Sequence, residues 1–286
     1  MASPKDRSDT DSSSPEDLSE RAPRAVETRS KADAARRVRL KIRRQDAPDR
    51  PETRRFEEFE VGWQPRMMVS AALRELDLEP VTSDGRRVAP VAWEAACLEE
   101  TCGACTMLIN GRVAQACSAL VDELSPRGKS IVLEPLRKFP LIRDLIVDRA
   151  RVFEALGRVH GWVDVDLEQP PAPAPAQAPA AQRAEYALGR CTSCAACLEA
   201  CPQWSEQREF VGAAALAQVR RLNLNPVGGL GRSERLERVM GPGGVADCGK
   251  AQNCVEVCPM QIPLVDGIQG VARDATKRLI FGWLLD

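Results

Sequence analysis

Eleven cysteines carry the clearest chemistry in this sequence, and their spacings are those of thiolate ligands to iron-sulfur clusters. The three groups are Cys97, Cys102, Cys105 and Cys117, then Cys191, Cys194, Cys197 and Cys201, and finally Cys248, Cys254 and Cys258. No cysteine is left over. We therefore interpret the groups as ligands for three clusters.

The first group has the spacing Cys97-x4-Cys102-x2-Cys105 with a distant fourth cysteine, Cys117. Plant-type [2Fe-2S] ferredoxins use this pattern. Gly103 suits a loop that folds tightly around a cluster, because glycine adopts positive φ and leaves room for backbone N–H bonds to sulfur. Zinc is the alternative, but four-cysteine zinc sites usually show two close pairs. Three closely spaced cysteines with one distant cysteine favour a [2Fe-2S] cluster over zinc.

The second group has the bacterial ferredoxin spacing and ends in Cys201-Pro202. In two-cluster ferredoxins the fourth cysteine of such a run ligates the other cluster, so a reciprocal run should follow. The run that ends in Cys258-Pro259 has this spacing, with Ala251 at one ligand position.

This crossing assigns the eight ligand positions of the two ferredoxin runs to two clusters. The predicted [4Fe-4S] ligands are Cys191, Cys194, Cys197 and Cys258, and the remaining set is Cys201, Cys248 and Cys254. Alanine has no lone pair to bind iron, so the second set predicts [3Fe-4S]. The alternative there is a four-iron cluster with water or another residue on its fourth iron.

Periodic apolar residues predict the elements that position the first group. Alternation over residues 38–42 predicts a strand, residues 56–61 a second strand, and an apolar stripe over residues 69–76 a helix. Asn110-Gly111 between two strand-like runs is a hairpin signal that would return Cys117 to the cluster. Residues 144–156 should form a helix that closes this domain.

The chain divides into four parts by composition. Residues 1–37 read as a disordered tail, and residues 38–166 as the [2Fe-2S] domain. Residues 167–183 form an extended Pro/Ala-rich linker. Residues 184–286 form a helical domain, with helical sequence at 210–222 and helical spacing from Leu264 to Ala275. The predicted class is α+β, a plant-type ferredoxin-like (β-grasp) domain followed by an α-helical bacterial-ferredoxin-like domain.

Charge and hydropathy narrow the choice of partners. The 40 basic residues balance 41 acidic ones, which gives no electrostatic reason to expect nucleic acid. No apolar run approaches the roughly 20 residues of a membrane span. The N-terminal tail fits neither a secretory signal nor a transit peptide, so we expect a reducing, cytoplasmic environment for the cysteines. His160, the single histidine, is assigned no chemistry.

Residues 38–286 resemble the iron-sulfur subunit of succinate dehydrogenase and fumarate reductase. The resemblance is carried by all eleven cysteines in order, the Cys-Gly-Ala-Cys of the first group, PLIRDL at residues 140–145, Pro202 and Pro259. It implies electron transfer between the flavin of an FAD-containing flavoprotein subunit and a quinone at a membrane anchor. The first group would lie nearest the flavin and the three-iron set nearest the quinone. It also implies a peripheral position on the cytoplasmic face of the bacterial inner membrane.

Two positions bear on the branch of this family. The ubiquinone-using branch has tryptophan and histidine where this chain has Glu206 and Gly249. Residues 210–215 and 248–254 look more like the branch that pairs with a dihaem cytochrome b anchor and uses menaquinone. Pro202 matches a family residue near the quinone. Trp204 either faces the anchor or packs against the cluster.

The apolar residues 279–285 suggest a second contact with the anchor. The alternative is a helix end folded onto its own domain. Two alternative functions are a subunit of another respiratory oxidoreductase, of the glycolate oxidase or heterodisulfide reductase type, and a zinc-binding interaction module. The first is not expected to combine a plant-type domain with Ala251, and the second predicts zinc without acid-labile sulfide.

Overall fold

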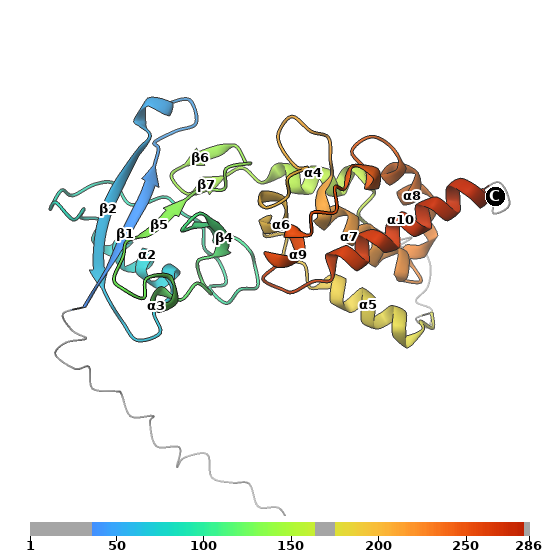
Figure 1. Cartoon of the computed structure of the whole chain (residues 1–286), viewed down its shortest axis with the longest axis horizontal. Helices are drawn as coiled ribbons and strands as arrows, with labels where there is room; N and C mark the ends of the chain where they lie inside the picture. Colours follow the sequence, from blue (N-terminus) through green and yellow to red (C-terminus); the bar gives the residue numbers. More distant parts are fainter. Residues whose placement is uncertain (1–35, 164–174, 283–286) are drawn as a thin grey trace, which may run out of the picture.

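The computed structural model describes residues 36–163 and 175–282, which form two lobes along the longest axis of the molecule (Figure 1). One lobe is built around a mixed β-sheet and the other is helical, which confirms the predicted α+β class. The expected tail, up to residue 35, and residues 167–174 of the expected linker lie outside the described residues.

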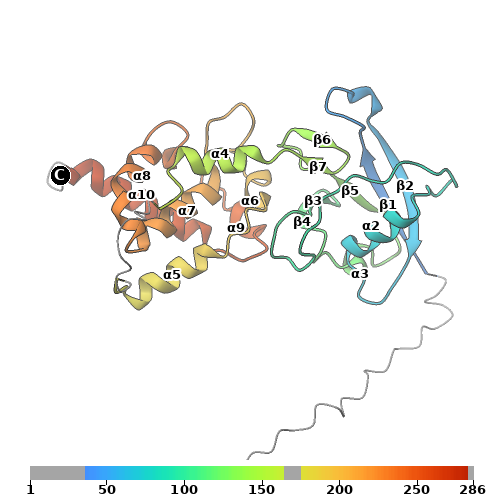
Figure 2. The ribbon, with the colours of Figure 1, turned by 180° about the vertical axis from the view of Figure 1, so that it is seen from behind.

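The N-terminal lobe contains a five-stranded sheet of order β2-β1-β5-β3-β4. Its strands are β1 (Arg37–Arg44), β2 (Arg55–Gly62), β3 (Thr106–Ile109), β4 (Arg112–Gln115) and β5 (Ile131–Glu134). β1 runs parallel to β5, while the other pairings are antiparallel. The alternating apolar residues of β1 are buried, as predicted. Helices α2 (Val69–Leu78) and α3 (Val121–Leu124) lie beside this sheet (Figure 2).

The predicted hairpin is confirmed. β3 and β4 pair in antiparallel register from Thr106 opposite Gln115 to Ile109 opposite Arg112. Asn110 and Gly111 both have positive φ, 50° and 78°, which is the requirement of the tight turn that matches the twist of a hairpin. The two short strands thus bring Cys117 back beside Cys105 in space, where Ala116 N–H donates to Cys105 O at 3.1 Å.

The predicted helix over residues 144–156 is wrong in its first half. Two short strands, β6 (Leu141–Arg143) and β7 (Ile146–Val147), occupy that region, and helix α4 begins only later (Ala150–Arg158). The turn between the strands places Asp144 at φ 46°. Its buried carboxylate pairs with Arg44 Nε at 3.0 Å and accepts the N–H of Gln45 and Ala92, each at 3.0 Å. Tertiary contacts therefore override the helical pattern here.

Arg44 sits at the centre of this buried charge cluster and also pairs with Glu57 at 2.8 Å. We expect Arg44→Met to lower the free energy of unfolding by about 3 kcal/mol or more, because it leaves two buried carboxylates without their main cation. Urea denaturation followed by circular dichroism measures this. Lys41→Met is the control. Lys41 lies on the same strand as Arg44, and its exposed pair with Glu58 of β2 is 3.7 Å long, so its loss should change stability by about 1 kcal/mol at most. Equal losses in both variants would contradict the prediction.

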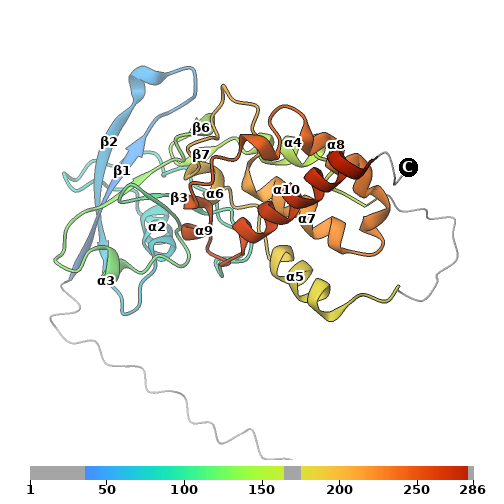
Figure 3. The same ribbon diagram turned by 45° about the vertical axis from the view of Figure 1, so that its right-hand side comes forward.

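The C-terminal lobe is a helical assembly around α7. Its helices are α5 (Pro179–Gly189), α6 (Ala196–Glu199), α7 (Gly212–Leu224), α8 (Arg232–Met240), α9 (Asn253–Glu256) and α10 (Leu264–Phe281), with 3-10 turns η3 (Gly228–Gly231) and η4 (Val245–Asp247). α7 contacts α5, α8 and α10, and its buried face is rich in alanine. The short helices α6 and α9 lie side by side at the end of the lobe that faces the sheet (Figure 3).

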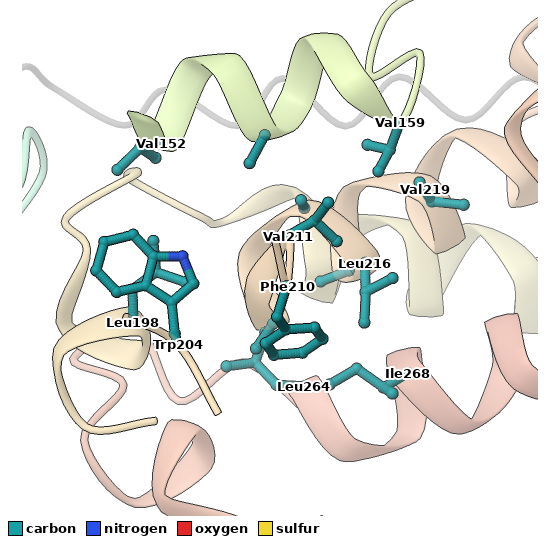
Figure 4. Packing of buried hydrophobic residues seen from close by; sticks show 14 of the residues in the cluster. Val152, Val159, Leu198, Trp204, Phe210, Val211, Leu216, Val219, Leu264 and Ile268 are labelled. Carbon is teal, nitrogen blue, oxygen red and sulfur yellow. The ribbon is translucent and has the colours of Figure 1, made fainter. Parts of the chain in front are cut away.

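Helix α4 packs into this second lobe, although the sequence places it in the first domain. Its buried Val152 belongs to one apolar cluster with Leu216 of α7 and Ile268 of α10 (Figure 4). Phe139, which precedes β6, joins the same cluster. The chain therefore crosses to the helical lobe earlier than composition suggests, because these apolar side chains find their burial there.

Two further boundaries differ from expectation. α5 begins at Pro179, inside the stretch expected to be an extended linker, and proline is tolerated in the first turn of a helix because no N–H is needed there. α7 continues to Leu224, beyond the predicted end at residue 222.

Helix α10 extends away from the N-terminal lobe and ends near the far tip of the molecule (Figure 1). Its first turns are buried through Ile268, Val271 and Ala275, whereas Leu279, Ile280 and Phe281 are 78%, 54% and 49% exposed. The last turn of α10 is thus about half exposed or more at these three residues, and residues 283–285 of the apolar stretch lie outside the described residues. Among the described helices, none combines the length and apolar composition needed to cross a membrane.

Candidate iron-sulfur sites

The first cysteine loop wraps its sulfur atoms in backbone donors. The N–H groups of Glu99, Thr101 and Cys102 each donate to Cys97 Sγ at 3.3 Å. Hydrogen bonds from Glu99 and Thr101 lower the pKa of the Cys97 thiol to about 7. A thiolate stabilised in this way is the form that binds metal. The loop therefore fits the demands of a cluster ligand.

The fourth cysteine of this group arrives from β4 on the buried side. Cys117 Sγ accepts the N–H of Glu100 at 3.2 Å. Burial, together with the neighbouring Cys105 and Cys97 sulfurs, raises the pKa of the Cys117 thiol to about 12. A buried sulfur beside other sulfurs is stable as a thiolate when a bound metal offsets its charge. Cys102, by contrast, is exposed, so one edge of this site reaches the surface.

The second set comes together from two distant segments of the chain. One pocket is lined by Cys191, Cys194, Cys197 and Cys258. Burial raises the pKa of the Cys191 thiol, and the neighbouring Cys194 and Cys258 sulfurs raise it further. Cys258 thus lies beside the run that begins at Cys191, although it follows Cys254 in sequence. The grouping is the one that the crossing pattern predicts.

The third set lines a separate cavity of about 370 Å³. Its cysteines are Cys201, Cys248 and Cys254, and Ala251 lies on the same wall. Burial and the sulfurs of Cys201 and Cys248 raise the pKa of the Cys254 thiol. Alanine thus replaces a fourth sulfur on the lining of this cavity.

The two ferredoxin runs share one backbone design. Ser193 and Ala195, which flank Cys194, have φ of 53° and 69°. Lys250 and Gln252, which flank Ala251, have φ of 56° and 65°. Residues other than glycine rarely adopt this left-handed backbone conformation. Because the same pair of left-handed residues flanks both positions, Ala251 has the local backbone geometry of Cys194.

The two residues expected near the quinone differ in exposure. Pro202 is exposed and lines the cavity of the third set. Trp204 is only 1% exposed, with its ring 4.7 Å from that of Phe139 and the Arg151 guanidinium 4.6 Å above it. Of the two alternatives for Trp204, this burial favours packing within the chain over contact with the anchor (Figure 4).

Sequence reasoning missed two polar residues that brace the cluster loops. Arg149 donates from Nη1 to Gly103 O at 2.8 Å and from Nη2 to Ala104 O at 2.6 Å. Glu199, between Cys197 and Cys201 of the second run, accepts the N–H groups of Arg137 and Lys138 at 3.2 and 3.1 Å. Both contacts join segments far apart in the chain, so no local pattern marks them. His160, assigned no chemistry, lies 3.1 Å from Glu234 Oε1 through Nδ1, away from the cysteines.

The fold and the cysteine loops define an iron-sulfur protein of two parts, and comparison with known families agrees. Residues 39–154 match the 2Fe-2S iron-sulfur cluster binding domain, and residues 187–262 match the 4Fe-4S dicluster domain. The two matches fall on the two lobes in the predicted order.

Curated relatives identify the family more closely. The chain is 43% identical over 237 residues to the succinate dehydrogenase iron-sulfur subunit of Bacillus subtilis, covering 83% of this chain and 92% of that protein. It is 29% identical over 220 residues to the fumarate reductase iron-sulfur subunit of Wolinella succinogenes, covering 76% and 88%. The chain belongs to the family of succinate dehydrogenase and fumarate reductase iron-sulfur subunits. It is therefore a subunit of an oxidoreductase, as predicted.

A solved structure shares the fold. The chain aligns with one from the Mycobacterium smegmatis Sdh1 complex in the apo form with a TM-score of 0.72 and 20% identity, covering 85% of this chain and 96% of that chain. The solved chain thus shares the fold of both lobes and their arrangement.

Proposed function

We propose that this chain relays electrons between the flavin of an FAD-containing flavoprotein subunit and a quinone held at a membrane anchor. The proposal rests on the serial order of the three cysteine sets. The first set borders the second run where Gly103 approaches Cys194. The second and third sets interlock, because Cys201 and Cys258 each line the cavity of the set to which the other run contributes most ligands. Such a series gives electrons one continuous path through the chain.

Each set of sulfurs is assigned one cluster. Cys97, Cys102, Cys105 and Cys117 hold [2Fe-2S], Cys191, Cys194, Cys197 and Cys258 hold [4Fe-4S], and Cys201, Cys248 and Cys254 hold [3Fe-4S]. The clusters, when bound, supply centres that accept and release single electrons. The chain's own residues bury the thiolates and donate N–H groups to them, and both effects tune the reduction potential.

Menaquinone and a dihaem cytochrome b anchor are the partners that we assign to the quinone end. Support comes from Glu206 and Gly249, which replace the tryptophan and histidine of the ubiquinone-using branch. Pro202 is exposed at the mouth of the third set and is placed nearest the quinone. The complex would lie on the cytoplasmic face of the bacterial inner membrane, with this chain as a peripheral subunit.

Electron paramagnetic resonance on the anaerobically purified protein tests the relay. Iron and acid-labile sulfide are quantified on the same sample, in oxidised and dithionite-reduced states. We expect a three-iron signal in the oxidised state and two-iron and four-iron signals after reduction. Zinc without sulfide would overturn the redox function, and two four-iron clusters would overturn the assignment of the third set.

The exposed end of α10 is assigned to the membrane anchor. Leu279, Ile280 and Phe281 are exposed apolar residues in the last turn of α10, the helix that ends at the tip farthest from the sheet. Deleting residues 279–286 is expected to move most of the flavoprotein and this chain from the membrane pellet to the supernatant on ultracentrifugation, because the apolar contact is lost.

A matched control tests whether membrane retention depends on the end of α10 in particular or on any exposed apolar residue. Leu78, at the end of α2, is 87% exposed, and Leu78→Ser should leave membrane retention unchanged. Full retention of the deletion variant would show that α10 does not contribute to docking.

A further inference from the structure

We propose that Gly103 sets the separation between the first and second clusters by allowing the two cysteine loops to touch through their backbones. This inference deepens the proposed electron relay and rests on it. The step it governs is the transfer of one electron from the reduced first cluster to the oxidised second one, with no bond or proton change.

Gly103 lies buried where the first cysteine loop meets the second run. A Cβ atom added to it would lie 2.7 Å from both Cα and Cβ of Cys194 and 3.1 Å from its backbone nitrogen. Atoms at these distances overlap, and the clash is with a backbone that cannot rotate away. Gly103 also has φ 72°, a conformation that side chains rarely adopt. Any other residue would push the two loops apart.

The contact joins two ligand segments directly. Cys102 and Cys105 flank Gly103 within the first set, and Cys194 is itself assigned to the second set. No side chain therefore stands between a ligand segment of one cluster and a ligand residue of the next. Electron transfer slows steeply as the gap between donor and acceptor widens, so this contact is where the structure minimises that gap.

Polar contacts fix Gly103 against Cys194. Its carbonyl oxygen accepts Arg149 Nη1 at 2.8 Å and the Thr106 hydroxyl at 2.8 Å. Arg149 immediately precedes α4, the helix that packs into the C-terminal lobe. Its guanidinium thus ties the first loop to the lobe that carries Cys194. The paired donors of arginine hold two neighbouring carbonyls at once, which lysine cannot reproduce.

Gly103→Ala in the assembled, membrane-bound complex tests the proposal. We expect iron and sulfide to be retained, magnetic coupling between the reduced first and second clusters to weaken, and reduction of the second cluster after rapid mixing with succinate to slow. The slowing should be roughly 10- to 100-fold, the scale that a misplacement of about 1 Å can reach.

Gly128→Ala is the matched control. Gly128 lies in the same lobe with φ 66°, but nothing lies within 4 Å of an added Cβ there. The two variants carry similar backbone strain and differ in the clash with Cys194. Unchanged coupling and transfer rate in Gly128→Ala, beside the losses in Gly103→Ala, supports the proposal. Equal behaviour of the two variants overturns it.

A second variant covers the case in which Gly103→Ala loses its first cluster. Arg149→Lys leaves Gly103 in place but removes the paired hydrogen bonds, and it should also weaken the magnetic coupling. Wild-type coupling in this variant, when Gly103→Ala cannot be loaded, overturns the proposal. Failure of the relay itself would appear differently, as a wild-type complex whose clusters succinate does not reduce.

Discussion

Cys258→Ser is expected to remove the four-iron signal while the three-iron signal survives, and to reduce succinate-driven quinone reduction to background. Cys258 lies beside Cys191 and lines the same pocket as Cys194 and Cys197. The other two cysteines of its run belong to the three-iron set. Serine keeps the size of the side chain but not the soft thiolate that iron-sulfur clusters need. A gap in the middle of the series should stop electrons from reaching the quinone.

Cys254→Ser is the matched control, four residues earlier in the same run. Cys254 has Cys201 and Cys248 as its sulfur neighbours, so its loss should remove the three-iron signal and spare the four-iron one. Electron paramagnetic resonance and iron content on both variants decide the matter. The reverse result, with Cys258→Ser losing the three-iron signal, would show that each run serves its own cluster.

Ala251→Cys is expected to convert the third cluster from three irons to four. The matched left-handed residues around Cys194 and Ala251 give position 251 the backbone of a ligand position. A sulfur placed there would complete a set of four thiolates on the lining of the third cavity. The oxidised-state three-iron signal should disappear, and iron should rise by about one per chain. Because cluster type sets reduction potential, quinone reduction should slow as well.

Ala251→Ser separates ligation from the effect of a larger side chain. Its hydroxyl is a poorer ligand for iron in a thiolate cluster, so the three-iron signal should remain. If Ala251→Cys keeps the oxidised three-iron signal at full intensity, position 251 does not face the cluster and the third set is built differently.

Local patterns were sufficient where burial follows periodicity. The alternation of Val38, Leu40 and Ile42 marks β1, the stripe from Val69 to Leu76 marks α2, and Asn110-Gly111 marks the hairpin, since each depends on neighbouring residues alone. Leu145 and Ile146 also fit a helical stripe. The helix predicted from residue 144 does not form there, because Arg44, a residue on another strand, holds Asp144 at positive φ.

In the candidate sites, too, local spacing predicts some features and tertiary packing decides the others. Cysteine spacing, read with the crossing rule of two-cluster ferredoxins, was enough to place Cys258 beside Cys191. Spacing says nothing about which surfaces meet. The approach of Gly103 to Cys194, the hydrogen bonds of Arg149 and the enclosure of Trp204 by Phe139 and Arg151 all depend on how two lobes pack, and the sequence around each residue carries no sign of it.

The interlocking of Cys201 and Cys258 between two sets has a consequence for biosynthesis. A nascent chain that has emerged as far as Cys201 holds three ligands of the proposed four-iron site and one of the three-iron site, and completes neither. The three-iron site is complete once Cys254 is available, and the four-iron site must wait for Cys258. Because ligand sets that span a long loop bind metal only as that loop closes, cluster loading and folding of the helical lobe become one late event. Ribosomes that stop before Cys248 would release a chain able to mature only its first site.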